Sequence, residues 1–452
     1  MGVITLQQAA QWCGGRFDPK HKDVTFFGAG SDAKTIGSGQ LYVALEGVGD
    51  DSAQIAEAFS RGAAAVLCNR CEVDCPAIEV SDIRIALGMI ARGERERIGM
   101  KVVGITGSVG KSTTKEMVAS VLQTTYRVNK TPINHNDDIT MPMALLAMEE
   151  DTEVAVVEMG VNPFREVAYL ASIAKPDVGV ITNIGTMHIE RLGSMDGILK
   201  AKLEIVEDMG RDGKIFLNGD DALLWNQRLV DGKEIDFFGI RNGDCHILGK
   251  DITECPGMLR FWACCQDKAF PVELALEGRH YVHDALAAIA VGLHFGVSPE
   301  NIRKSLAEFQ NAAGRQEIYQ AKDYTIIRDC YNAGPESMAA ALEVMGKQPG
   351  RHVAVLGDML ELGVCTQAEH YKVGRIAAEK ADILLTFGEN SVRMLNGALT
   401  GGMSQTNARS FTDRDRLVEV LKQRAKPGDV ILFKGSRGMR MEMILQKFLE
   451  ET

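Results

Sequence analysis

The sequence predicts an α/β protein of three domains, because of its length, its alternating pattern and the interruptions in that pattern. At 452 residues the chain is too long for a single hydrophobic core. Apolar segments of strand length alternate with amphipathic segments of helix length, which is typical of a parallel sheet covered on both faces. A charged run at residues 92–97 interrupts the alternation, which restarts around residues 312–315. We therefore expect domains at residues 1–98, 99–312 and 313–452.

Composition narrows the classes of partner. The net charge of −11 and a pI near 5.4 argue against nucleic acid or an anionic membrane as the main partner. No apolar run approaches the roughly 20 residues of a membrane span, and the first residues lack the layout of a signal peptide. Ten scattered cysteines are typical of reduced thiols in the cytoplasm. Cys68, Cys71 and Cys75 have spacing suggestive of zinc, but no fourth ligand follows at the usual distance, so separate thiols are favoured.

The first domain reads as a small α/β unit. Strands are expected at residues 40–45 and 64–67, and helices at 6–12, 53–61 and 83–97. Between them, residues 28–34 form a loop that could hold a polar ligand, although this loop alone would be read as a plain turn.

The second domain opens with a glycine-rich stretch, GITGSVGKST, at residues 104–113. An apolar strand precedes it and an amphipathic helix follows it. In this arrangement backbone N–H groups and a helix N-terminus receive phosphate, Lys111 neutralises charge and the Ser112 hydroxyl binds Mg²⁺. Ile105 stands where the common P-loop has its first glycine, so the match is to a shorter variant. The flanking strand and helix favour an ATP site over an ordinary turn.

Polar side chains end the next two predicted strands, at residues 153–158 and 178–183. Glu158 closes the first strand and Asn183 the second, and His188 follows soon after. Ligands collect at the carboxyl ends of strands in open α/β sheets. Taken singly, Glu158 would be a solvated strand end and His188 an ordinary loop histidine. Next to a phosphate loop they predict a metal and nucleotide site, with Glu158 as the second Mg²⁺ anchor.

The rest of the second domain is expected to hold a helix starting at Pro142, a helix capped by Ser194 that runs to about residue 209, and a long helix at 285–295. Shorter alternating segments at 235–275 predict a small antiparallel sheet. The third domain repeats the strand–helix alternation and is expected to be a doubly wound, Rossmann-like α/β domain, with strands at 325–329, 352–356, 383–387 and 429–433.

These pieces together resemble the Mur ligases, the ATP-dependent enzymes that build the peptide of bacterial cell-wall precursors. The resemblance covers essentially the whole chain. It rests on the following motifs: TGSVGKS (106–112), EMG (158–160), TNIGTMH (182–188), AKLEI (201–205), GRH (278–280), YNAGP (331–335), VLGDMLELG (355–363) and KGSRGM (434–439). The last two point to the subfamily that adds D-alanyl-D-alanine.

The resemblance implies a mechanism. A carboxylate of UDP-N-acetylmuramoyl (UDP-MurNAc) tripeptide attacks the γ-phosphate of ATP, and the amine of D-Ala-D-Ala displaces phosphate from the acyl phosphate. Lys111 would hold the β- and γ-phosphates, and Arg315 would reach the γ-phosphate when the third domain closes. Ser112 and Glu158 would hold one Mg²⁺ ion, and His188 and a carbamylated Lys202 a second one. Without the family, Lys202 would be read as a solvated helix lysine.

The resemblance also implies two wider sets of contacts. The expected nucleotide-binding residues are Gly107, Ser108, Gly110, Lys111, Ser112, Thr113, Asn134, Asn183, Asp284, Arg315, Asp329, Tyr331 and Asn332. The expected residues for the acceptor and the incoming dipeptide are Ser31, Asp32, Lys34, Asp51, Asp358, Lys434, Ser436 and Arg437. The implied protein is a cytoplasmic bacterial monomer that takes small-molecule substrates and inserts into no membrane.

Several positions depart from the family pattern. The departures in the second and third domains are Asp137 and Thr140 for asparagine and glycine, Tyr281 and Asp284 for asparagine, and Arg328 for aspartate. In the first domain, Lys34 and Ala53 replace the usual arginine and histidine. Two alternatives therefore stay open: a paralogue that ligates a different acceptor and amine, and a nucleotide-binding homologue with impaired catalysis. The sequence does not distinguish L-lysine from diaminopimelate as the third residue of the acceptor.

Overall fold

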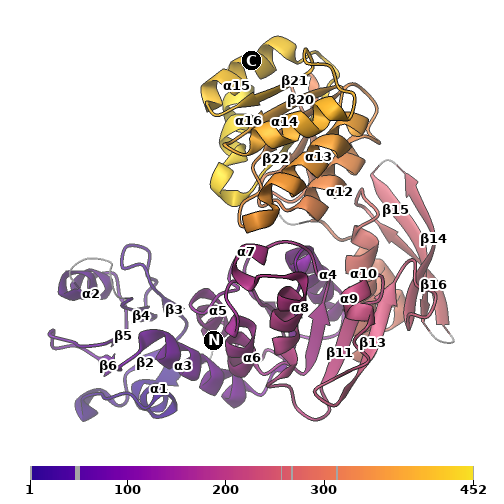
Figure 1. Ribbon diagram of the computed structural model, residues 1–452. Helices are drawn as coiled ribbons and strands as arrows, with labels where there is room; N and C mark the ends of the chain where they lie inside the picture. The colour runs from indigo at the N-terminus through magenta and orange to yellow at the C-terminus, as the bar shows by residue number, and fades with distance from the viewer. Residues whose placement is uncertain (1–2, 46–50, 256, 266–267, 312–313, 451–452) are drawn as a thin grey trace.

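The computed structural model describes residues 3–45, 51–255, 257–265, 268–311 and 314–450. The expected restart of the alternation at 312–315 falls partly on residues 312 and 313, which lie outside this set. Figure 1 shows a central sheet, a second sheet region beside it at the N-terminal end of the chain and a third above it. No described helix is long and apolar enough to cross a membrane.

The N-terminal region contains a parallel four-stranded sheet, in the order β3-β4-β5-β6, and a small antiparallel pair, β1-β2. Its elements are β1 (Ile4–Thr5), α1 (Leu6–Cys13), β2 (Thr25–Phe26), β3 (Ala29–Gly30), β4 (Leu41–Val43), α2 (Asp51–Ser60), β5 (Ala65–Cys68), β6 (Ala77–Glu79) and α3 (Ile83–Ile98). Residues 28–34, expected to be a loop, include the short strand β3, which pairs with the edge of β4.

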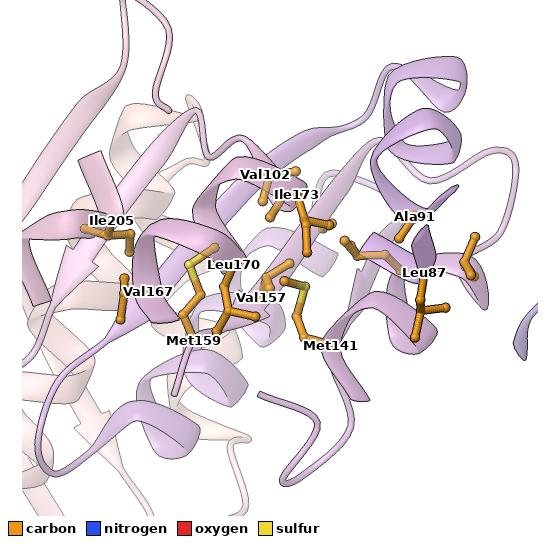
Figure 2. Packing of buried hydrophobic residues seen from close by; sticks show 14 of the residues in the cluster. Leu87, Ala91, Val102, Met141, Val157, Met159, Val167, Leu170, Ile173 and Ile205 are labelled. Atoms are coloured by element: carbon orange, nitrogen blue, oxygen red, sulfur yellow. The ribbon is translucent and has the colours of Figure 1, made fainter. Parts of the chain in front are cut away.

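Helix α3 joins the N-terminal region to the central sheet. Leu87 and Ala91 on α3 share one apolar cluster with Met141 and with Val157 on the central sheet (Figure 2). The charged run at 92–97 is part of this junction, because Arg95 donates to the carbonyl oxygens of residues 174 and 175 at 3.0 Å. The run is therefore the docked end of a helix and not an exposed linker.

The central region is organised on one ten-stranded sheet of the described residues. The main order is β16-β15-β14-β13-β11-β10-β7-β9-β8, and β12 pairs with β13. The strands are β7 (Lys101–Thr106), β8 (Val128–Lys130), β9 (Val154–Glu158), β10 (Val178–Ile181), β11 (Lys214–Asn218), β12 (Leu229–Val230), β13 (Lys233–Gly239), β14 (Ile247–Cys255), β15 (Met258–Cys265) and β16 (Lys268–Leu274). The helices are α4 (Lys111–Gln123), α5 (Thr140–Leu146), α6 (Glu166–Ala174), α7 (Ile189–Leu192), α8 (Met195–Leu203), α9 (Ala222–Trp225), α10 (Tyr281–His294) and α11 (Pro299–Ala307).

Alternate residues of the central strands enter two cores, because successive side chains point to opposite faces of a sheet. Val102 and Val157 pack on the face covered by α3, α5, α6 and α8. Val103 and Val156 pack on the face covered by α4, α10 and α11. The doubly wound parallel sheet expected from the sequence is thus present from β8 to β14.

The small antiparallel sheet expected at 235–275 is not a separate sheet. Strands β14, β15 and β16 do pair antiparallel, but β14 also pairs in parallel with β13 and so extends the central sheet. Three helix boundaries also differ from expectation. Helix α5 begins at Thr140, α8 ends at Leu203 before a 3-10 turn (Glu204–Val206), and α10 begins at Tyr281. The predicted cap is confirmed, since the Ser194 hydroxyl accepts from the Gly197 N–H at 3.0 Å.

The C-terminal region is a six-stranded sheet in the order β17-β18-β22-β19-β20-β21, with only β17 antiparallel among the described strands. Its elements are β17 (Glu317–Ala321), β18 (Tyr324–Asp329), α12 (Pro335–Met345), β19 (His352–Gly357), α13 (Thr366–Lys380), β20 (Ile383–Phe387), α14 (Ser391–Thr400), β21 (Ala408–Phe411), α15 (Arg414–Arg424), β22 (Val430–Lys434) and α16 (Met441–Glu450). Helices α12–α14 cover one face and α15 and α16 the other, as expected for a doubly wound domain. The sequence did not indicate β17 and β21.

Candidate functional site

The phosphate loop joins the end of β7 to the start of α4. Gly107 and Gly110 adopt φ angles of 150° and 87°, which L-residues rarely take. A Cβ on Gly107 would lie 1.9 Å from the Thr182 hydroxyl oxygen. The loop is held by the neighbouring strand, because the Val109 N–H donates to the Asn183 side-chain oxygen at 2.9 Å. The result is a fixed turn that opens the N-terminus of α4, the geometry that receives phosphate.

Strand register brings the predicted polar residues to this loop. β7 lies between β9 and β10, both parallel to it, so Ile105 pairs with Glu158 and Thr106 with Ile181. The carboxyl ends of the three strands therefore meet at one edge. Lys111 donates to the carbonyl oxygens of Gly107 at 2.7 Å and Ser108 at 3.2 Å. Burial lowers the pKa of Lys111, although the Glu158 charge acts in the opposite direction.

Glu158 is a buried carboxylate held at both oxygens. One oxygen accepts from the Ser112 hydroxyl at 2.6 Å and the other from the Asn136 amide at 2.8 Å. Burial alone would raise the pKa of this group, but Lys111, Ser112 and the buried Lys115 together lower it. An anionic carboxylate touching a hydroxyl beside a phosphate loop supplies the hard oxygen ligands that Mg²⁺ takes. These two residues fit the first predicted metal site.

The second predicted metal site consists of a histidine and a lysine. His188 lies in the same cleft, and Lys202 is buried, with its pKa well below the ordinary value because of burial and the nearby Lys111 charge. A buried, uncharged amine is the state that can react with CO₂. Over the described residues, no three His, Cys, Asp or Glu side chains are grouped to hold a metal ion.

The opposite wall comes from the C-terminal region. The Arg315 guanidinium donates to the Ser112 hydroxyl at 2.8 Å and lies 4.1 Å from the centre of the Tyr331 ring. Lys434 is buried, 2.5 Å from a carboxylate oxygen of Asp329, and it donates to the Asn332 carbonyl at 3.1 Å. This wall therefore presents an arginine and an aromatic ring directly to the phosphate loop.

The two walls enclose a cleft of ≈ 480 Å³. The predicted site residues that line it are Ser108, Gly110, Lys111, Ser112, Thr113, Glu158, Asn183, His188, Asp284, Arg315, Asp329, Tyr331, Asn332 and Lys434. A volume of this size suits a nucleotide-sized ligand.

Asp284, one of the departures from the family pattern, faces the phosphate loop from α10. It accepts from the Thr114 hydroxyl at 2.8 Å, and the same oxygen lies 2.7 Å from where a Cβ on Gly110 would be. Burial raises the pKa of Asp284 to about 7, with Thr114 and Arg315 opposing the shift. A second departure, Asp137, accepts from both the N–H and the hydroxyl of Thr140, the first residue of α5, at 2.7 Å.

Other predicted residues lie outside the lining of this cleft. Asn134 is exposed, and Gly107 and Lys202 are buried. Asp358 and Ser436 are buried in local hydrogen bonds, to the N–H groups of residues 390 and 360 respectively. Arg437 is exposed and 3.2 Å from Glu442.

The predicted residues of the N-terminal region, Ser31, Asp32 and Lys34, lie on the β3–β4 connection. There the Asp32 carboxylate accepts from the Lys34 N–H at 2.9 Å. Asp51 begins α2, and its side chain is outside the described part of the structure.

Sequence reasoning missed several groups that the fold brings to the site. Lys115 is fully buried, donates to the Thr131 carbonyl and lies 3.9 Å from Glu158. Its position four residues after Lys111, on the same face of α4, could have indicated it. Glu336 and Glu361 line the cleft from the C-terminal region, within the quoted YNAGP and VLGDMLELG stretches or next to them. Both glutamates become part of the cleft only because the two walls lie against each other.

Comparison with known proteins gives a consistent answer along the chain. The Mur ligase middle domain matches residues 105–292, and the Mur ligase glutamate ligase domain matches residues 314–437. The UDP-N-acetylmuramoyl-tripeptide–D-alanyl-D-alanine ligase of Bacillus subtilis is 36% identical over 442 residues, which cover 96% of this chain and 95% of the relative.

Solved structures agree with this match. MurF from Acinetobacter baumannii superimposes with a TM-score of 0.90 at 31% identity, and the match covers 100% of both chains. MurF from Thermotoga maritima, in complex with ADP, superimposes with a TM-score of 0.82 at 28% identity, covering 94% of this chain and 97% of that one. The chain belongs to the Mur ligase family.

Proposed function

We propose that this protein is an ATP-dependent ligase that joins D-alanyl-D-alanine to UDP-N-acetylmuramoyl-tripeptide, a step of peptidoglycan precursor synthesis. The observation that carries the proposal is the contact between Arg315 and Ser112. It joins the C-terminal region to the phosphate loop of the central region across the cleft. The full-length similarity to ligases of this name and the ADP-bound relative support it.

In the proposed reaction the terminal carboxylate of the tripeptide attacks the γ-phosphorus of ATP, and ADP leaves. The amine of the dipeptide then adds to the acyl phosphate, and the tetrahedral intermediate expels phosphate. Little covalent chemistry falls to the protein, so its task is positioning and charge neutralisation. Lys111 and Arg315 supply positive charge from opposite walls, and the N–H groups of the glycine-rich turn orient the phosphates.

We further propose that Ser112 and Glu158 hold one Mg²⁺ ion, and that His188 and a carbamylated Lys202 hold a second. Such ions would neutralise the charge that develops on the phosphates. Carbamylation fits Lys202, because burial lowers the pKa of the amine and disfavours its charged form, and a carbamate there would lie near the opposite charge of Lys111.

We assign the binding of the acceptor and of the incoming dipeptide to the N-terminal and C-terminal regions respectively. Residues 1–98 would bind the uridine nucleotide through Ser31, Asp32, Lys34 and Asp51. Residues 313–452 would bind the dipeptide near Lys434, with Asp358, Ser436 and Arg437 shaping the surrounding loops. We propose a monomer that acts in the bacterial cytoplasm.

The test is phosphate release by the purified protein with Mg-ATP and bicarbonate. UDP-MurNAc-tripeptide and D-Ala-D-Ala are added separately and together, and the product is identified by mass spectrometry. Turnover only with both substrates, giving the pentapeptide nucleotide, is the expected result. ATP binding without this product would overturn the proposal in favour of a changed acceptor or an impaired site.

The carbamate has its own test in Lys202→Ala. We expect ligation to fall by roughly 10- to 100-fold or more, as for loss of a group that supports a metal, and added bicarbonate to restore nothing. Lys200→Ala is the matched control, because Lys200 is exposed on the same helix. A Lys202→Ala enzyme with wild-type activity would contradict the carbamate.

A further inference from the structure

The loop after β19 in the C-terminal region reaches across the cleft to the loop that carries His188. Oε2 of Glu361 lies 2.7 Å from Nδ1 of His188, and both residues line the cleft. The two residues follow strands of different sheets, β10 and β19, and lie far apart in the sequence. Their contact therefore exists only when the two walls are together.

Both partners are held in unusual backbone conformations. His188 has a φ of 64° and precedes the first residue of α7, and Glu361 has a φ of 63°. Non-glycine residues rarely adopt positive φ, and such residues cluster at functional positions. The 2.7 Å distance between Glu361 Oε2 and His188 Nδ1 shows that, from these backbone positions, both side chains point toward the same place in the cleft.

Neighbouring contacts fix the approach of the two loops. The Glu190 N–H points to the Glu361 carbonyl at 3.5 Å, and a Cβ on Gly363 would lie 3.0 Å from the Glu190 backbone. Glu336 accepts from the Thr186 N–H at 3.1 Å on the same loop. Glu361 is therefore one member of a defined interface and not a freely moving surface acid.

We propose that Glu361 is a positioning residue for His188, so that closure of the C-terminal domain and binding of the second cation are coupled. This inference rests on the proposed function, since it takes His188 as a metal ligand. Glu361 itself touches neither substrate nor metal in the proposal. It acts through the imidazole.

The physical basis of the coupling is which ring nitrogen of His188 carries the proton and which one is left to bind a metal ion. A carboxylate beside Nδ1 favours the proton on that nitrogen and leaves the lone pair of Nε2 for a metal ion. The contact works through charge and distance and is not a well-aligned hydrogen bond. The other charged group that acts on Glu361 is Arg191, on the same short helix as His188. When the domains separate, His188 loses this partner, and by linkage a bound metal favours the closed form.

The experiment compares wild type with Glu361→Gln, which keeps the shape but removes the charge. His188→Ala serves as the reference for loss of the metal ligand. Glu379→Gln, an exposed glutamate on α13 of the same domain, is the control for charge. Mn²⁺ binding to the full chain with ADP is followed by electron paramagnetic resonance, and the radius of gyration of the ligand-free protein by X-ray scattering.

His188→Ala should abolish one Mn²⁺ site. Glu361→Gln should lower the Mn²⁺ affinity of that same site by about 10- to 100-fold and increase the radius of gyration of the ligand-free protein. Glu379→Gln should behave like wild type in both measurements. An unchanged Mn²⁺ affinity and radius in Glu361→Gln would overturn the inference, as would wild-type Mn²⁺ binding in His188→Ala. Failure of the proposed function is seen separately, as a wild-type protein that makes no pentapeptide nucleotide while its Mn²⁺ affinity still depends on Glu361.

Discussion

The two walls of the cleft are built in different ways. On the central wall, the groups that face the cleft are fixed by one strand–turn–helix unit and its neighbouring strands, as in the Ser112–Glu158–Asn136 chain of hydrogen bonds. On the C-terminal wall, Arg315, Glu336 and Glu361 meet the central wall only through contacts between domains. The comparison indicates a preformed phosphate site and a second half-site that depends on domain closure.

The largest expected effect is on the preformed wall. Lys111→Ala should lower kcat/KM for ATP-dependent phosphate release by about 10²–10³-fold, because one fixed charge aimed at the phosphates is lost. The melting temperature should change little, because Glu158, which loses the Lys111 charge, keeps Lys115 at 3.9 Å and its hydrogen bonds to Ser112 and Asn136. Lys250→Ala, an exposed lysine on β14, is the control. Activity within a factor of two of wild type would show that the wall does not bind phosphate.

Asp284 tests whether a buried carboxylate on the preformed wall destabilises the folded protein when it is ionised. Its pKa of about 7 in the folded protein lies above the ordinary 3.8, so the unfolded chain loses this proton first as the pH rises. Stability therefore falls between about pH 4 and pH 7, and the penalty is complete above pH 7. Asp284→Asn removes it and keeps the acceptor for Thr114.

Asp284→Asn should accordingly stabilise the protein at pH 8, by on the order of a few kcal/mol, with little gain at pH 4. Thermal unfolding followed by circular dichroism at both pH values measures this. Equal gains at both would rule out the titration of Asp284 as the cause.

Arg315 tests the dependence of the other wall on closure. Arg315→Lys keeps the charge but loses the planar group that reaches Ser112 and stacks on Tyr331. We expect kcat to fall about tenfold, with a smaller change in KM for ATP, because the phosphate loop still binds the nucleotide. Steady-state kinetics in saturating acceptor and dipeptide measure the two constants. A rise in KM alone would place Arg315 in ground-state binding.

The smallest effect is expected at Asp137. Its carboxylate lines the cleft and accepts from the Thr140 N–H, so Asp137→Asn removes the charge and retains an acceptor for Thr140. Repulsion of phosphate by one partly solvated charge costs about 1 kcal/mol or less, so KM for ATP should drop by at most about fivefold. A raised KM would mean that Asp137 acts through a cation and not by repulsion.

The sequence by itself determined the elements whose signals are local. The glycine-rich turn, Lys111 and Ser112 follow from a strand, a turn and a helix that are contiguous, and Glu158 follows from its place at the end of an apolar strand. The doubly wound regions follow from the alternation of strand and helix. Strands β17 and β21 were not predicted, because edge strands carry weaker apolar patterns. Strands β14–β16 were predicted as a sheet of their own, because the sequence of a segment does not specify which strand it pairs with.

Tertiary structure alone decided which distant groups meet. Nothing near Lys202 in the sequence marks it as buried beside Lys111, and nothing in the residues around Glu361 names His188 as its partner. Burial and charge contacts depend on how sheets and loops pack, and packing joins residues without regard to their separation along the chain. The preformed wall could therefore be predicted from local sequence signals. On the wall that closes on it, Arg315 and Tyr331 were indicated only by the family resemblance, and Glu361 was not indicated as a site residue.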